Sequence, residues 1–469
     1  MYMDCKVRLL ELNIKNLKNI GSGVITFNSL NNINKCDFDF ESSDIIGVYG
    51  PNGSSKSSLI DSLTILKKIF TNKSLEDEYY DYISVLSKEM FIKLSLYCCV
   101  KKIHYIIDYS IIISKFGENS VKITHEKIDY KYYVDGAWTN QRTLFEVNNN
   151  EDNDNFITPK QNLNYLLKNN KKLLLDLCVL KGKKESNKLS FLFSEEFCNI
   201  LFNNYEYNFF SYILKILNIY FNFCYHLYDN KEISSIAAKN LVPFFYKEEC
   251  GDGVNGVYGN LCLNKDSYIK ECHLNSVKNS IKNINLILSK IIPDLEIYLD
   301  DLSKSKDENG ELIVNYILMS KRPKYNIPLK FESDGIKKII SILFSLVDAF
   351  NNPFAILIID EFDSGIYEFL LGVILDIFKE KGYGQFLFTS HNLRALEVLK
   401  DDIVFTTIDE NNRFSRIKYL KPTNNLRNIY LRNLYLKKDD ELGINIDEYD
   451  IYKALLKAGV IFKYGEEKQ

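Results

Sequence analysis

The sequence predicts an α/β protein in which a mixed sheet and an antiparallel β subdomain are interrupted by a mostly helical insertion. An apolar strand at residues 44–50 runs into a glycine-rich loop and a helix at 55–70. Two runs rich in β-branched and aromatic residues, 90–100 and 103–114, are typical of an antiparallel meander. Strand and helix patterns alternate again from 331 to 389, as they do in open α/β sheets.

The remaining elements follow in chain order. Residues 6–14 and the segment GVITF after them are expected strands that precede the glycine-rich loop. Residues 146–156 form an Asn/Asp-rich linker, and the pattern then turns mostly helical and aromatic up to a helix at 275–292. The segments DLEIYL and ELIVNYILMS predict one strand hairpin, and DIVFTTID and RFSRIKYLK predict another. The expected units are an N-terminal lobe (1–140), a mostly helical insertion (141–290), a C-terminal lobe (291–425) and a helical tail (426–469).

The overall charge excludes a strongly basic protein. The 469-residue chain carries 59 Lys and Arg against 62 Asp and Glu, for a formal net charge of −3, whereas nucleic-acid-binding domains tend to be basic. Residues 168–188 hold seven lysines and two acidic residues and could grip phosphate backbones, although a solvated helix face explains them better. No stretch reaches the about 18 uncharged apolar residues that a membrane helix needs, and we expect a soluble, cytoplasmic protein with no membrane partner.

Two patterns in the sequence are too weak to indicate a metal or dinucleotide site. The ten cysteines form no C-x-x-C pair, and the intervals among Cys250, Cys262, Cys272 and His273 match no zinc finger or ribbon, which favours free thiols. The stretch GDGVNGVYG at 251–259 contains G-x-G-x-x-G, but a polar segment precedes it and no clear helix follows. We therefore interpret it as a glycine-rich loop rather than a dinucleotide-binding fingerprint.

The glycine-rich loop after residue 49 has the pattern of a phosphate-binding P-loop. Its sequence G-P-N-G-S-S-K-S compares with G-x-x-x-x-G-K-[ST], in which backbone N–H groups and the helix N-terminus face phosphate oxygens. Lys56 is expected to reach the β- and γ-phosphates, and Ser57 to bind Mg²⁺. The candidate nucleotide-binding residues of the loop are Gly50, Pro51, Asn52, Gly53, Ser54, Ser55, Lys56, Ser57 and Ser58.

Ser55 stands where this pattern carries a glycine. A serine can sit in the first turn of a helix and keeps its backbone N–H, but its side chain adds bulk close to the phosphates. We therefore expect nucleotide binding to be retained and turnover to be slower.

A second strand supplies the acidic residues that phosphoryl transfer requires. AILIIDEFDSG is an apolar strand that ends in Asp360 and Glu361. Asp360 is expected to hold Mg²⁺ through water, and Glu361 to polarise the attacking water. His391 ends a further strand, on the side of an open α/β sheet where ligands bind, and it could contact the γ-phosphate or the water.

A helix after FESDG offers a further anion site. Ser333 is expected to cap this helix, whose apolar residues follow helical spacing. Its hydroxyl, the free N–H groups and the helix dipole would all favour an anion, although an ordinary N-cap has the same pattern.

The order of these motifs resembles that of the ABC/SMC class of AAA-type ATPases, which includes RecF, Rad50 and OLD-type heads. Within this class the chain is similar to the stand-alone ATPases found beside bacterial phage-defence and abortive-infection genes. The resemblance runs from LLELNIKNLKNIGSGVITF to KPTNNLRNIYLR, over nearly the whole chain. It implies an ABC-type ATPase head that uses ATP and Mg²⁺.

The resemblance also implies roles for single residues. It places Gly50, Gly53, Lys56 and Ser57 in the Walker A loop, Asp360 and Glu361 in Walker B, Asp363 in the D-loop, His391 as the switch histidine, and Ser333 and Gly335 in the signature motif that meets the γ-phosphate of the opposite subunit. The catalytic candidates are then Glu361, His391 and Lys56, and the Mg²⁺ ligands are Ser57 and Asp360. No glutamine occurs between residues 62 and 140, so the family's Q-loop glutamine has no counterpart there.

Three functions remain open at the level of sequence. The first is a sensor or regulatory ATPase of an antiviral system, a homodimer or higher oligomer that works with a separate nuclease or toxin. The second is a RecF- or Rad50-like repair ATPase that binds DNA. The third is a scaffold that binds ATP with little turnover.

Overall fold

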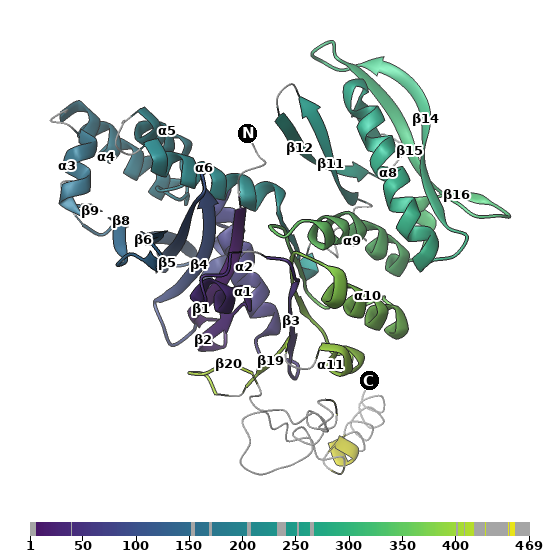
Figure 1. Cartoon of the computed structure of the whole chain (residues 1–469), viewed down its shortest axis with the longest axis horizontal. Helices are drawn as coiled ribbons and strands as arrows, with labels where there is room; N and C mark the ends of the chain where they lie inside the picture. The colour runs from purple at the N-terminus through teal and green to yellow at the C-terminus, as the bar shows by residue number, and fades with distance from the viewer. Residues whose placement is uncertain are drawn as a thin grey trace, which may run out of the picture.

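The computed structural model describes most of the chain (Figure 1). The described residues are 6–38, 40–151, 155–167, 171–203, 208–231, 241–250, 253–262, 267–399, 402–407, 409–416, 427, 449 and 451–454. No helix among them is long and apolar enough to cross a membrane.

A six-stranded sheet forms the centre of the molecule. Its order is β10 (Tyr225–Tyr228), β17 (Ile356–Ile359), β18 (Gln385–Thr389), β3 (Asp44–Tyr49), β19 (Ile403–Thr406) and β20 (Phe414–Ser415). The first five strands are parallel, and only β20 is antiparallel. These short apolar strands are buried along their whole length, as expected for parallel strands covered on both faces.

A second, antiparallel sheet packs beside the first. Its strands are β1 (Lys6–Leu17), β2 (Ile20–Thr26), β4 (Glu89–Val100), β5 (Ile103–Phe116), β6 (Ser120–Val134), β7 (Ala137–Trp138), β8 (Arg142–Asn148) and β9 (Ile157–Thr158). Short elements α1 (Ser29–Asn34) and η1 (Asp77–Tyr80) lie in its connections. The predicted meander is confirmed, because β4 pairs along its entire length with β5.

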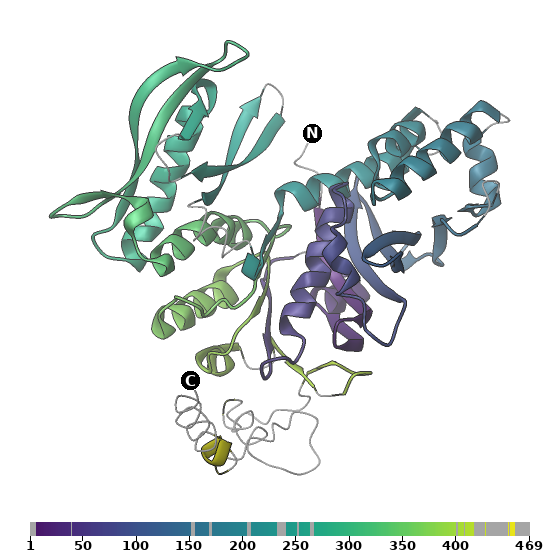
Figure 2. The same cartoon turned by 180° about the vertical axis from the view of Figure 1, so that it is seen from behind.

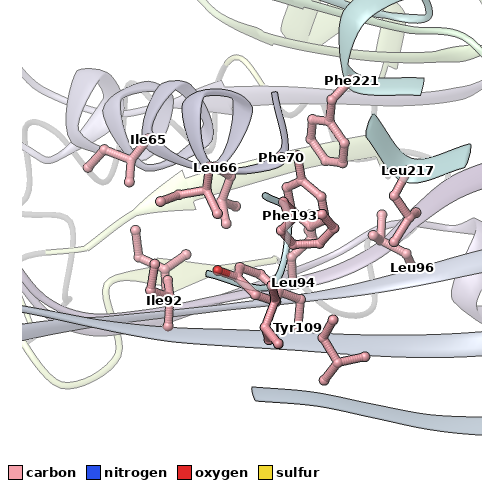
Figure 3. Close-up of a cluster of buried hydrophobic side chains, with 14 of the residues drawn as sticks. Ile65, Leu66, Phe70, Ile92, Leu94, Leu96, Tyr109, Phe193, Leu217 and Phe221 are labelled. Carbon is pink, nitrogen blue, oxygen red and sulfur yellow. The ribbon is translucent and has the colours of Figure 1, made fainter. Parts of the chain in front are cut away.

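Helix α2 (Lys56–Phe70) lies between the two sheets and belongs to the largest hydrophobic cluster. Near its end, the ring of Phe70 stacks on Phe221 with centroids 4.0 Å apart and packs on Phe193 and Tyr109 (Figure 3). On the other face of the central sheet lie α9 (Asp334–Asn351), α10 (Glu368–Lys381) and α11 (Arg394–Leu399), as Figure 2 shows from behind.

Helices α3 (Lys160–Leu167), α4 (Lys171–Ser186), α5 (Glu195–Asn203) and α6 (Asn208–Phe223) form a helical part at one end of the molecule (Figure 1). Helix α6 leads directly into β10 of the central sheet. At the opposite end, α8 (Glu271–Ile291) packs on β13 (Ser267–Lys270), β14 (Glu296–Lys306) and β15 (Leu312–Lys321). The strand β16 (Asn326–Pro328) and the turn η2 (Leu329–Phe331) connect this unit to α9.

The structure differs from the sequence prediction at several places. The predicted loop at 251–259 is wrong, because β11 (Leu241–Cys250) and β12 (Gly253–Cys262) pair as an antiparallel hairpin. Glycine recurs there at every third residue from 253 to 259, and backbone pairing with β11 outweighs the weak strand preference of glycine.

The proposed unit boundaries at 140 and 290 remain a prediction. Paired strands lie on opposite sides of each boundary. The N-terminal sheet continues past residue 140 through β8, and β10 of the predicted insertion joins the central sheet. Most of the predicted helical tail, 426–469, lies outside the described residues.

Candidate functional site

The P-loop connects the carboxyl end of β3 to α2, as the sequence predicts. Gly53 has a φ of +77°, a left-handed backbone conformation that favours glycine, and nothing lies within 4 Å of its Cβ position. A Cβ on Gly50 would lie 1.7 Å from the Thr406 hydroxyl oxygen of β19. The first glycine is therefore required by the close approach of a neighbouring strand, and the second by the backbone conformation.

Ser55 also has a left-handed backbone, with φ +82° and ψ 10°, at the N-cap of α2. A glycine at this position would adopt the conformation without a steric penalty, whereas other residues pay roughly 1–2 kcal/mol. The side chain is 4% exposed, and its Oγ donates to Asn19 Oδ1 at 2.8 Å. Serine in place of glycine therefore affects the backbone conformation of the loop, in addition to the bulk that its side chain adds.

Lys56 lies folded over the P-loop. Its Nζ donates to the carbonyl oxygens of Gly50, at 2.8 Å, and Pro51, at 2.9 Å. The residue is 7% exposed, and burial lowers the pKa of its amine, an effect that the nearby charges of Asp360 and Glu361 oppose. A buried ammonium group at the start of a helix is suited to bind a phosphate group.

Asp360 lies directly after β17 and is close to the P-loop. Its Oδ1 accepts a hydrogen bond from Thr389 Oγ1 at 2.5 Å, and its carboxylate also interacts with the Ser57 hydroxyl. Burial raises the pKa of Asp360, and the hydrogen bonds from Thr389 and Ser57 oppose this shift. The structure thus brings together the two predicted Mg²⁺ ligands, Asp360 after β17 and Ser57 in the first turn of α2, although β18 lies between β17 and β3 in the sheet.

Glu361 follows with a left-handed backbone, at φ +47°, and its N–H donates to Thr389 Oγ1 at 2.8 Å. Thr389, at the end of β18, therefore holds both acidic residues. His391 lies two residues further on, and its backbone N–H donates to Asp363 Oδ2 at 3.2 Å. Burial and the charge of Lys56 lower the pKa of His391, which favours a neutral imidazole.

The predicted signature residues lie at the exposed start of α9. Ser333 caps the helix, with its Oγ accepting from the Ile336 N–H at 3.4 Å. Within the described residues, Ser333 and Gly335 line a pocket of about 470 Å³ with residues of α8 and α10, and this pocket contains no P-loop residue. The structure therefore does not bring the signature residues to the P-loop of the same chain.

The start of α9 is instead attached to the turn 361–365 after β17, which we call the D-loop. A Cβ on Gly335 would lie 2.6 Å from the carbonyl oxygen of Gly365, so the two backbones are in direct contact. Lys338 donates to the carbonyl oxygens of Glu361 and Ser364, both at 2.8 Å. Burial lowers the pKa of Lys338 to about 8.

The residues present fit a nucleotide with Mg²⁺. The Asp360 carboxylate and the Ser57 hydroxyl are oxygen donors of the type that Mg²⁺ prefers. The P-loop N–H groups, the α2 N-terminus and Lys56 are suited to phosphates. Burial raises the pKa of Asp360 and lowers the pKa of Lys56, so it disfavours the charged form of both groups. A bound metal–phosphate complex would place a cation beside Asp360 and an anion beside Lys56, and would therefore favour the charged forms.

The lysine-rich run at 168–188 is mostly occupied by contacts within the chain. Lys183 and Lys184 both pair with Glu196, and Lys188 pairs with Asp77. Lys181 is buried and donates to the carbonyl oxygen of Glu151 at 2.8 Å. Four of the seven lysines are thus engaged within the chain, which supports their interpretation as a structural face.

Sequence reasoning missed four residues that support the site, namely Asn19, Lys338, Thr389 and Thr406. Thr389 precedes the predicted Ser-His pair, so its place at a strand end was a usable signal. The other three residues contact the site from distant parts of the chain, and no local pattern marks them.

Residues 272–397 match the family model described as "AAA domain, putative AbiEii toxin, Type IV TA system". No curated protein is significantly similar to the chain.

The fold is similar to solved SMC heads. The SMC head domain from Thermotoga maritima is 13% identical, with a TM-score of 0.36 over 88% of this chain and 100% of that chain. An SMC head bound to the C-winged helix domain of ScpA is 13% identical, with a TM-score of 0.41 over 87% of this chain and 98% of that chain. The Smc head domain from Pyrococcus furiosus is 13% identical, with a TM-score of 0.39 over 88% of this chain and 96% of that chain. Residues 272–397 are thus similar to an AAA domain, and this segment contains the strand β17 that ends beside the P-loop.

Proposed function

We propose that this chain binds ATP with Mg²⁺ at the P-loop and hydrolyses it, and that a second copy of the chain completes the site. The observation that carries the proposal is the contact between Ser57 and Asp360, which brings the P-loop to the acidic strand end. Phosphoryl transfer requires mainly positioning and charge neutralisation, and these residues supply both.

Each residue then has a defined task. Lys56, the P-loop N–H groups and the α2 N-terminus bind the phosphates, and Ser57 and Asp360 hold Mg²⁺. Glu361 orients and polarises the attacking water, and Thr389 fixes the backbone of Glu361 through the hydrogen bond at 2.8 Å. His391, held at its N–H by Asp363, contacts the γ-phosphate or the water with a neutral imidazole.

The dimer is proposed because the anion site at Ser333 is exposed and lies apart from the P-loop of its own chain. Two chains placed head to tail would let each α9 N-terminus face the γ-phosphate bound by the other chain. ATP would then join the subunits and hydrolysis would release them, so that the nucleotide shifts the population of dimers.

The biological role that we propose is regulation of a separate nuclease or toxin in a bacterial antiviral system. The matched family model, whose description names a toxin of a type IV toxin–antitoxin system, supports this context. A DNA-repair role is less favoured, because four lysines of the most basic segment are engaged within the chain. A scaffold with little turnover is the second candidate, and the left-handed backbone of Ser55 favours it.

Phosphate release and ATP binding by the wild type and Glu361→Gln test hydrolysis. The carboxamide cannot polarise water, so we expect release to fall about 100-fold or more, the scale of one lost transition-state contact, while MgATP still binds. The matched control is Glu380→Gln on the exposed face of α10, which should release phosphate at the wild-type rate. Equal background rates in all three proteins would favour the scaffold, and a wild type that does not bind MgATP would overturn the proposal.

A further inference from the structure

Asn19, in the turn between β1 and β2, contacts the P-loop at three points. Its Nδ2 donates to the carbonyl oxygen of Gly53, and its Oδ1 accepts from the hydroxyls of Ser55, at 2.8 Å, and Ser58, at 3.2 Å. One side chain therefore spans the loop from its central glycine to the first turn of α2. All three hydrogen-bond partners of the Asn19 amide named here belong to the proposed nucleotide site.

The contact with Ser55 coincides with the most strained part of the loop. Ser55 keeps φ at +82°, a conformation that disfavours residues with a Cβ. Such a backbone persists when the surrounding structure over-determines it. The hydrogen bond to Asn19 fixes the serine side chain in a place where it does not compete for the backbone N–H groups of the loop.

The turn that carries Asn19 is itself held by the C-terminal hairpin. Arg413 donates to the Asn19 carbonyl oxygen and, at 2.8 Å, to that of Thr407. From the same hairpin, Thr406 Oγ1 donates to Ser54 Oγ at 2.6 Å. The P-loop is therefore supported from two sides by segments that lie far from it in the sequence.

We propose that Asn19 is a positioning residue for nucleotide binding, which holds Ser55 in the left-handed conformation that a glycine would otherwise supply. The backbone of the P-loop around Ser55 is then held in its shape before the nucleotide arrives. This inference rests on the proposed function, because it concerns the same P-loop, and it adds the device by which a loop with serine in place of glycine stays competent.

Because the proposal links two residues, a double-mutant cycle tests it. MgATP affinity is measured by calorimetry for the wild type, Asn19→Ala, Ser55→Gly and the double variant. In the serine background the loss of Asn19 leaves a buried hydroxyl without its acceptor, and we expect about 10-fold weaker binding. In the glycine background the same change should cost less than about 3-fold, because glycine needs no support at positive φ.

Ser55→Ala gives a second arm, since alanine keeps the strain and loses the hydroxyl. It should bind MgATP more weakly than Ser55→Gly. The matched control is Asn28→Ala, which loses side-chain hydrogen bonds to Asp402 and Arg416 away from the P-loop and should keep the wild-type affinity even if it unfolds at lower temperature.

The outcomes separate this inference from the proposed function. Equal losses from Asn19→Ala in the serine and glycine backgrounds would overturn the positioning role while leaving ATP binding intact. A wild type without measurable MgATP affinity would instead overturn the proposed function. Thermal unfolding of each variant identifies any that bind weakly only because they fail to fold.

Discussion

At the scale of single residues, the site brings together residues with an unfavourable backbone conformation and residues with a buried ionisable group. Ser55 and Glu361 both have positive φ without being glycine, and each is held by a polar contact, to Asn19 and Thr389 respectively. Lys56 and Lys338 are buried amines that donate to backbone carbonyl oxygens. Strain and buried charge at one place are typical of functional sites, where the surrounding structure maintains them.

Lys338 makes stability depend on pH in a defined direction. Its pKa falls from 10.5 to about 8 on folding, so between these values the unfolded chain binds the proton and the folded chain does not. The free energy of unfolding therefore rises with pH across this window through this group. Denaturant titrations at pH 7 and pH 9.5 should show that the wild type gains stability relative to Lys338→Met. A relative loss at high pH would contradict the lowered pKa.

At the scale of elements, the first turn of α9 is joined to the D-loop by direct backbone contact. The carbonyl oxygen of Gly365 occupies the space of a Cβ at Gly335, and Gly365 itself has a φ of +75°. We therefore expect α9 and the strand end with Asp360 and Glu361 to move as one unit. A substitution at Gly335 should therefore also displace the D-loop.

Gly335→Ala tests this contact. The new methyl group would lie 2.6 Å from a backbone oxygen that cannot move aside freely, and we expect a loss of about 1–3 kcal/mol in the free energy of unfolding. Gly182→Ala in α4 is the control, because nothing lies within 4 Å of its Cβ position. That change should be neutral or stabilise by up to about 1 kcal/mol. Urea denaturation measures both, and a neutral Gly335→Ala would rule out the close approach.

Local patterns in the sequence predict the elements that carry the chemistry. Residues 44–70 form β3, the P-loop and α2 as predicted, because an apolar run, a glycine-rich turn and helical spacing are local signals. The strand at 253–262 was missed, because its glycines are typical of loops and only pairing with β11 decides its structure. Asn19 could not be predicted, since it meets Ser55 across 36 positions of the chain. Long-range polar contacts of this kind leave no periodicity.

At the scale of the whole molecule, the helical part is connected to the site by the chain itself and by strand pairing. Helix α6 runs into β10, and β10 pairs in parallel with β17, the strand that ends in Asp360. Glu126 of β6 is fully buried and accepts hydrogen bonds from Tyr109, Ser190 and the Phe191 N–H, which joins the antiparallel sheet to the connection between α4 and α5. We therefore expect a displacement at the proposed nucleotide site to reach the helical part through these strands.

We propose that two chains share each nucleotide, and sedimentation of Glu361→Gln with and without MgATP distinguishes this arrangement from a site within one chain. The blocked water attack should trap the bound nucleotide, so we predict a doubling of the sedimenting mass only when MgATP is present. In the same background, Ser333→Asp keeps an equally good helix cap but places a negative charge against the γ-phosphate, and it should bind MgATP while remaining a monomer. A Glu361→Gln protein that binds MgATP and stays monomeric would contradict the shared site.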